Sequence, residues 1–137
     1  ATLQQKAVEM ELPRISFEGY SNKVGEYYSQ ATVLCLTSTF EGWGLCLTEA
    51  QAHGVIPFAF GCSAGVKEIL SPSGVNGYII PPFSIRKYAR SLVALLNNPS
   101  RIKEMQMNVI QKSKKYSTEA VGLSWLCLFD SLFVSQK

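Results

Sequence analysis

Short apolar runs alternate with helical patterns along most of the chain. The apolar runs predict buried strands, which we place at residues 15–17, 32–37, 57–60 and 78–80. Between these runs, apolar positions at helical spacing predict helices at residues 2–11, 22–30 and 45–53 and a helical turn at residues 66–70. Strands that alternate with helices are typical of a parallel sheet with helices on both faces. The pattern therefore predicts an α/β, Rossmann-like fold.

The chain after the last of these strands is expected to be helical. The first helix there is marked by an apolar stripe, closed by residues 97–99, that consists of Ile85, Tyr88, Ala89, Leu92, Leu95 and Leu96. Ser100 and Ser117 are the expected N-caps of the two helices that follow. In the last helix one face carries Val121, Trp125, Phe129 and Leu132.

Length and composition indicate one globular unit. The 137 residues suffice for a single domain with a real core. A hydrophobic share of 47% and a charged share of 17% are those of a soluble protein. No apolar run approaches the roughly eighteen residues of a membrane span, and the first residues form no signal peptide. We therefore expect a cytoplasmic protein.

The charge pattern gives little support to a nucleic-acid partner. A net charge of +3 is too small to argue for nucleic-acid binding. Basic residues gather in one stretch, which contains Arg101, Lys103, Lys112, Lys114 and Lys115. The usual interpretation of such a run is a solvated helix face. The weaker alternative is peripheral attraction to anionic lipid at a membrane surface.

Four cysteines are present, and their spacing contains no C-x-x-C pair. Cys35, Cys46, Cys62 and Cys127 fall mostly within apolar runs. We expect reduced thiols in the protein core, as in a cytoplasmic protein.

The chemistry is concentrated in residues 41–50, EGWGLCLTEA, where two glutamates flank a glycine-rich turn into a helix. Gly42 and Gly44 let the backbone approach a ligand closely, and the first amides of a helix are unpaired donors that favour an anion such as a diphosphate. Glu41 and Glu49 would lie roughly 12 Å apart along the helix axis, at 1.5 Å per residue. They cannot clamp one metal ion together. They can accept hydrogen bonds from hydroxyls at the two ends of an extended ligand, which suits a sugar nucleotide.

Several motifs, in order and at matching intervals, resemble the donor-binding half of retaining GT-B glycosyltransferases of the family-4 type (glycosyltransferase group 1). The matching pieces are FEG at 17–19, TSTFEGWGL at 37–45, EAQAHGVIP at 49–57, GVKEIL at 65–70, NGYII at 76–80 and LLNNP at 95–99. The resemblance covers nearly the whole chain. Trp43 stands where the family usually has Phe, Gln51 stands for Met, and the proline before Ser38 is absent.

The resemblance implies transfer of a sugar from a nucleotide-diphosphate sugar to an acceptor hydroxyl with retention, as in polysaccharide biosynthesis. The implied donor-binding residues are Glu41, Gly42, Trp43, Gly44, Leu45, Cys46 and Glu49. Glu41, the residue assigned to catalysis, would bind donor-sugar hydroxyls and Glu49 the ribose hydroxyls, while the amides around Gly44, Leu45 and Cys46 face the diphosphate. Trp43 would at most shape the sugar pocket. No metal or cofactor is expected, because no D-x-D pattern occurs and GT-B enzymes generally bind the donor without metal.

Two further features carry alternatives. The loop Gly19, Tyr20 and Ser21 borders the nucleotide base by resemblance, and a plain loop is an equally good interpretation. His53, the single histidine, lies near an expected helix C-terminus, where it is favourable for structural reasons, and we assign it no catalysis. UDP is the expected nucleotide from its frequency in the family, with GDP and ADP left open.

Compared with the family, residues 1–137 form a single partial domain. The acceptor-binding domain, two strands of the donor domain, and an Arg and a Lys that usually hold the diphosphate have no counterpart in this sequence. In the sheet order 3-2-1-4-5-6 the two missing strands separate residues 15–17 from residues 32–37. Because of the missing strands, we expect a displaced first strand or self-association. Because the acceptor-binding domain and the diphosphate-binding Arg and Lys are missing, we expect a carbohydrate or lipid-linked acceptor to bind elsewhere and this chain alone to be inactive.

Two other functions stay open. The first is a sugar-nucleotide epimerase with a GT-B-like fold, whose product would be an altered free sugar. The second is a non-catalytic interaction module of the same fold. The intact pair Glu41 and Glu49, with the glycines between them, argues against the second.

Overall fold

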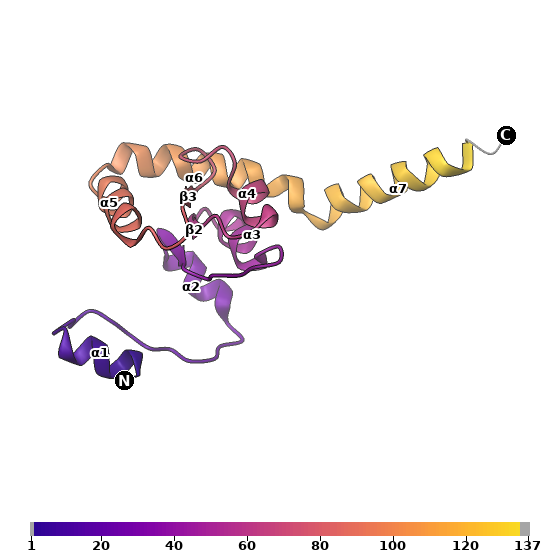
Figure 1. Cartoon of the computed structure of the whole chain (residues 1–137). Coiled ribbons are helices and arrows are strands. Elements are labelled where there is room, and N and C mark those ends of the chain that lie inside the picture. The colour runs from indigo at the N-terminus through magenta and orange to yellow at the C-terminus, as the bar shows by residue number, and fades with distance from the viewer. Residues whose placement is uncertain (1, 135–137) are drawn as a thin grey trace.

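The structure of the chain, a computed structural model, describes residues 2–134 (Figure 1). Among these residues one parallel sheet is formed in the order β1-β2-β3, from β1 (Val33–Leu36), β2 (Ile56–Phe60) and β3 (Tyr78–Ile80). In the register of the sheet, Val33 pairs with Ile56 and Phe58 with Tyr78. The three later strands expected from the sequence are confirmed, with small shifts at their ends.

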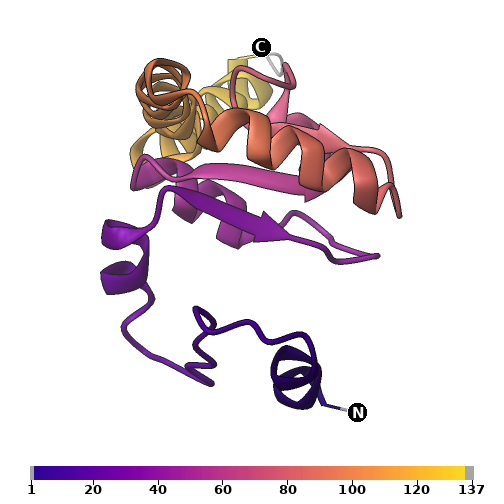
Figure 2. The same cartoon turned by 90° about the vertical axis from the view of Figure 1, so that its left-hand side faces the viewer.

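Helices cover both faces of this sheet. Figure 2 shows α5 (Ile85–Leu96) in front of the strands and α3 (Leu45–Ala52) behind them. The other elements are α1 (Leu3–Glu9), α2 (Val24–Gln30), α4 (Ala64–Leu70), α6 (Pro99–Ser113), the 3-10 helix η1 (Lys114–Tyr116) and α7 (Thr118–Val134). The predicted α/β, Rossmann-like fold with helices on both faces is confirmed.

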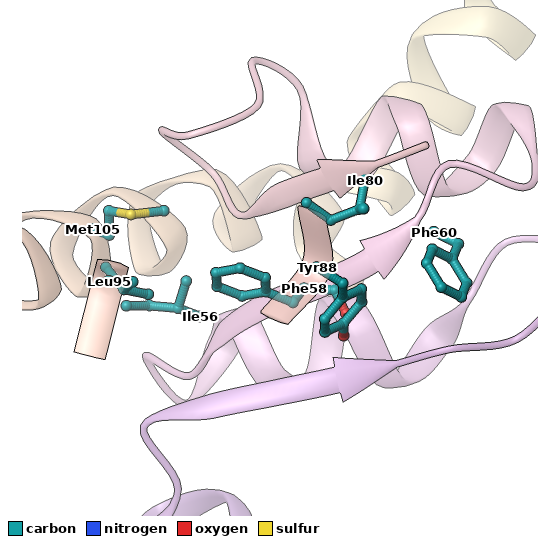
Figure 3. Packing of buried hydrophobic residues seen from close by; sticks show 7 residues of the cluster. All are labelled: Ile56, Phe58, Phe60, Ile80, Tyr88, Leu95 and Met105. Atoms are coloured by element: carbon teal, nitrogen blue, oxygen red, sulfur yellow. The ribbon is translucent and has the colours of Figure 1, made fainter. Parts of the chain in front are cut away.

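The central strand β2 is buried along its whole length. Because side chains on a strand alternate between the two faces, its residues feed two hydrophobic clusters. Figure 3 shows the larger cluster, which comprises Ile56, Phe58, Phe60, Ile80, Tyr88, Leu95 and Met105. The cluster on the other face comprises Leu47, Ala59, Val66, Ile69 and Leu70. The sheet is thereby fixed to α5 and α6 on one side and to α3 and α4 on the other.

The apolar stripe predicted on α5 is confirmed in its middle. Tyr88 and Leu95 are buried, and Leu92 packs against the same cluster. The ends of the stripe differ, since Ile85 is 73% exposed and Leu96 is 49% exposed.

The strand predicted at residues 15–17 is wrong. These residues form neither helix nor strand, and both views show α1 and the following segment apart from β1 (Figures 1 and 2). A strand needs a neighbour for its backbone donors and acceptors. In the described part of the chain only β2 pairs with β1, so its other edge is free and no new pairing closes the gap.

The two predicted helix caps have different outcomes. Ser117 is confirmed, because its Oγ accepts a hydrogen bond from the backbone N–H of Ala120 at 3.2 Å. Ser100 is wrong, because Asn98 caps α6 and accepts from the N–H of Arg101 at 3.0 Å. The helix starts earlier than predicted since proline suits the first helical position, here Pro99.

Helix α7 projects from the body of the molecule (Figure 1). The face predicted from the sequence is present, but it contacts no core, because Val121, Trp125, Phe129 and Leu132 are all between 44% and 56% exposed. None of the helices in the described residues is long and apolar enough to cross a membrane.

The basic run on α6 and η1 lies on the surface and is partly paired. Arg101 forms an ion pair with Glu104 at 2.6 Å, and Lys115 forms one with Glu68 at 2.8 Å. These pairs favour the solvated-face interpretation. Attraction to a lipid surface stays a prediction.

The four cysteines are free, as expected, and their predicted placement in the core is confirmed in part, because Cys46 and Cys62 pack against the buried cluster around Leu47. Cys35 and Cys127 are exposed, and Cys46 and Cys62 are only partly buried. The two exposed cysteines lie at the margins of the fold, Cys35 on the free-edged strand β1 beside Tyr88 of α5, and Cys127 on the projecting helix α7.

Candidate functional site

The candidate site lies where the loop after β1 turns into α3. Gly44 is the N-cap of α3, with φ of 84° and ψ of 60°. This left-handed conformation favours glycine. A Cβ at Gly42 would meet no described atom within 4 Å, and Leu45 is 69% exposed, so the start of α3 faces open space. The first amides of a helix are in general donors without a full set of partners within it, and such amides favour an anion.

Both glutamates act on Cys46. The pKa of the Cys46 thiol is raised mainly by burial, and then by the charges of Glu41 and Glu49. Glu41 is half-buried in the loop and Glu49 is exposed on α3. Both carboxylates are therefore close enough to the first turn of α3 to add negative charge near Cys46. Cations or hydroxyl groups from a ligand would be favoured beside them, while the helix amides favour its anionic part.

A tyrosine from another helix contacts the site. The hydroxyl of Tyr28, on α2, lies 3.2 Å from Glu49 Oε2 and 3.3 Å from the carbonyl oxygen of Cys46. Burial, with the nearby Glu49, raises the pKa of Tyr28 to about 12. Tyr28 is therefore a protonated donor at neutral pH.

The loop before α3 is held by α4. The Ser63 hydroxyl donates to the carbonyl oxygen of Gly42 at 3.2 Å. The backbone approaches so closely that a Cβ at Gly65 would lie 2.6 Å from that same oxygen and 2.9 Å from Trp43 Cα. The Trp43 ring packs edge to face against the Tyr116 ring of η1, with ring centroids 5.5 Å apart. Because Trp43 is 41% exposed, one part of its ring stays free to line a ligand pocket.

The predicted base-binding loop lies apart from these residues. Tyr20 is 97% exposed, and a Cβ at Gly19 would meet no described atom within 4 Å. Ser21 Oγ accepts a hydrogen bond from the Lys23 N–H at 3.0 Å. The structure does not bring Gly19, Tyr20 and Ser21 against the start of α3, and their contact with a base stays a prediction.

His53 is the C-cap of α3, as its sequence position indicates. Its Nδ1 lies 2.9 Å from the carbonyl oxygen of Glu49, and its ring lies 5.3 Å from the Tyr28 ring, centroid to centroid. Within residues 2–134 no group of three or more His, Cys, Asp or Glu side chains is placed to hold a metal ion.

The structure thus gathers the predicted donor stretch around one helix start and adds residues that sequence reasoning missed. The gathered residues are Glu41, Gly42, Trp43, Gly44, Leu45, Cys46 and Glu49. The missed ones are Tyr28, Ser63 and Tyr116, together with the steric role of Gly65. Gly65 lies within a matched motif, which was a signal. The others carry no signal in a single sequence, since their contacts come from distant elements.

A parallel α/β sheet with a glycine-capped helix at the carboxyl end of a strand defines the class of open-sheet domains that bind ligands at that edge. The family described as Glycosyl transferases group 1 matches residues 1–116, and the chain belongs to it.

Relatives and solved structures agree with this assignment. An uncharacterized glycosyltransferase of Haemophilus influenzae is 32% identical over 120 residues, which is 88% of this chain and 33% of that protein. Sucrose-phosphate synthase of Thermosynechococcus elongatus superposes with a TM-score of 0.82 at 25% identity, covering 96% of this chain and 34% of that one. A mutant of S. aureus TarM, in complex with fondaparinux, alpha-GlcNAc-glycerol and UDP, gives 0.80 at 27% identity over 92% of this chain and 26% of that one. The chain spans a third or less of the length of the curated relatives it matches first.

Proposed function

We propose that residues 1–137 form part of the donor site of a glycosyltransferase that moves a sugar from a nucleoside-diphosphate sugar, most simply a UDP-sugar, to an acceptor hydroxyl with retention. The observation that carries this proposal is the glycine-capped start of α3, with Glu41 in the loop before it and Glu49 on the helix itself. The UDP in the S. aureus TarM complex supports the choice of base.

Each part of the site has a role in this proposal. Glu49 accepts hydrogen bonds from ribose hydroxyls, and Glu41 accepts them from donor-sugar hydroxyls. The amides of Gly44, Leu45 and Cys46 face the diphosphate, where the positive end of α3 stabilises the charge that grows as the nucleotide leaves. No metal ion or cofactor is required in this scheme.

In this proposal, acceptor binding is the task of other parts of a longer protein. A carbohydrate or lipid-linked acceptor binds there, in a cytoplasmic protein. We expect the 137-residue chain alone to transfer no sugar.

The test is calorimetric titration of the full-length protein with UDP, GDP and ADP. We expect one nucleotide to bind and Glu49→Ala to weaken it by about tenfold or more, because hydrogen bonds to charged groups contribute about 1.5–3 kcal/mol. Glu26→Ala is the matched control, since Glu26 is an exposed glutamate whose carboxylate pairs with Lys23 across one helical turn. If none of the three nucleotides binds, or if Glu49→Ala and Glu26→Ala behave alike, the proposal is wrong.

A second measurement addresses the reaction itself. Incubation of the full-length protein with the matching nucleotide sugar and acceptor is expected to give a glycosylated product that retains the donor's anomeric configuration by NMR. An altered free sugar as the product would instead identify an epimerase.

A further inference from the structure

One buried hydroxyl outside the donor stretch contacts it directly. Tyr28 is 8% exposed and packs with Ala50 of α3 and with Val55. Its ring is therefore fixed against the helix that carries Glu49. Its hydroxyl reaches Glu49 Oε2 at 3.2 Å, as well as the Cys46 carbonyl oxygen at 3.3 Å.

We propose that Tyr28 is a positioning residue that holds the Glu49 carboxylate for the ribose of the donor, and so favours ribonucleotides over nucleotides that lack the ribose hydroxyls. This inference rests on the proposed function, in which Glu49 accepts the ribose hydroxyls.

The physical argument is one of preorganisation. Glu49 is exposed on α3, and an exposed glutamate samples many rotamers. Fixing such a side chain costs up to about 2 kcal/mol in conformational entropy, which a ligand would otherwise offset on binding. The Tyr28 hydroxyl, which donates from a buried ring, restricts the Glu49 carboxylate before the ligand binds. Because Tyr28 contacts Oε2, the other oxygen, Oε1, remains to accept from the ribose.

The Tyr28 ring also packs against His53. The His53 ring lies 5.3 Å from the Tyr28 ring at an angle of 32°, and His53 Nδ1 lies 2.9 Å from the carbonyl oxygen of Glu49. Tyr28, Glu49 and His53 thus form one connected group across α2 and α3. This gives the single histidine a structural place beside the donor site without a catalytic role.

The test compares UDP with 2′,3′-dideoxy-UDP on the full-length protein, or the corresponding pair for GDP or ADP if the titration above selects that base. In the wild type we expect UDP to bind at least about tenfold more tightly. Tyr28→Phe keeps the buried ring and removes only the hydroxyl. It is expected to reduce the ratio of the two affinities severalfold while the affinity for the dideoxynucleotide stays close to that of the wild type.

Two controls separate positioning from a general loss of structure. Tyr88→Phe removes a comparable buried hydroxyl, which donates to the Phe58 carbonyl oxygen at 2.7 Å on the opposite face of the sheet. It is expected to lower the melting temperature without changing the affinity ratio. In the double variant Tyr28→Phe with Glu49→Ala, the ratio is expected to equal that of Glu49→Ala alone.

The outcomes are distinguishable. If Glu49→Ala removes the preference for UDP over the dideoxynucleotide but Tyr28→Phe does not change it, the role of Tyr28 is wrong and the proposed function stands. Equal weakening of both nucleotides by Tyr28→Phe makes it a purely structural residue and also overturns the inference. A wild type that binds UDP but does not distinguish it from the dideoxy form overturns the ribose role of Glu49, and the inference with it.

Discussion

Cys46 is the residue that both glutamates of the site influence. Burial, Glu41 and Glu49 all raise the pKa of its thiol, so less of it is thiolate near pH 8, and the thiolate is the reactive form. We expect iodoacetamide to alkylate Cys46 more slowly than the exposed Cys127 of the same molecules. Glu41→Gln and Glu49→Gln each remove a negative charge, lower this pKa and accelerate alkylation, by about tenfold for a full pKa unit.

Peptide mass spectrometry against time measures both rates within one sample. Cys127 serves as the internal control, and Glu104→Gln, which changes an exposed glutamate of α6 that pairs with Arg101, is expected to leave the rate at Cys46 as it was. Were neither glutamine variant to change that rate, the placement of the two carboxylates around the first turn of α3 would be incorrect.

Sequence reasoning reached part of this site. Glu41, Gly44 and Glu49 were accessible because a glycine at a helix start, with acids on either side of it, is a local pattern. Tyr28 and Ser63 were not, since each acts on a backbone or side chain that lies about twenty residues away. Only the tertiary arrangement of α2, α3 and α4 brings them to the site.

At the scale of elements, α4 and the donor loop approach each other through a glycine. Gly65→Ala would place a Cβ less than 3.0 Å from backbone atoms of Gly42 and Trp43, so the loop or the helix has to move. We expect a loss of about 1–3 kcal/mol in the free energy of unfolding, the usual cost of overpacking, and weaker nucleotide binding. Urea unfolding and calorimetric titration measure the two effects.

The chain offers a matched control for this substitution. Gly25 is also the second residue of a seven-residue helix, α2, and among the described atoms a Cβ there would meet just His53 Nε2, at an ordinary contact distance of 3.8 Å. Gly25→Ala is expected to be neutral or to stabilise by up to about 1 kcal/mol through helix propensity. Equal effects of the two alanines would show that helix propensity, and not the close backbone approach, governs Gly65.

The elements themselves were predictable to different degrees for a physical reason. β3 was found at its observed residues because an apolar run between turn residues is a local signal. Residues 15–17 carry the same kind of run, yet they form no strand, since pairing depends on a neighbour that a local pattern does not reveal. The apolar face of α7 was likewise correct as a helical period, while its lack of burial was not visible in that period.

At the scale of the whole molecule, apolar surface and an unpaired edge remain open. Beside the end of β1 lies an apolar groove of about 400 Å³, lined by Thr37, Phe60, Ile85, Tyr88, Ala89 and Leu92. The outer edge of β1 pairs with no described strand, and α7 exposes large apolar side chains. Free edges of this kind template pairing with another chain. We therefore expect the isolated 137-residue chain to self-associate, with a weight-average mass that rises with concentration in sedimentation equilibrium.

Two exposed cysteines allow the responsible surface to be located. Cys35→Lys places a charge on β1, and charged side chains on an edge strand oppose edge-to-edge pairing, whereas Cys127→Lys places the same charge on α7. If association uses the β1 edge, Cys35→Lys shifts the sedimentation profile toward the monomer and Cys127→Lys does not. If instead Cys127→Lys shifts the profile toward the monomer and Cys35→Lys does not, the associating surface is α7 and not the edge of β1. If the chain stays monomeric at every concentration, neither surface mediates association and the prediction of self-association is wrong.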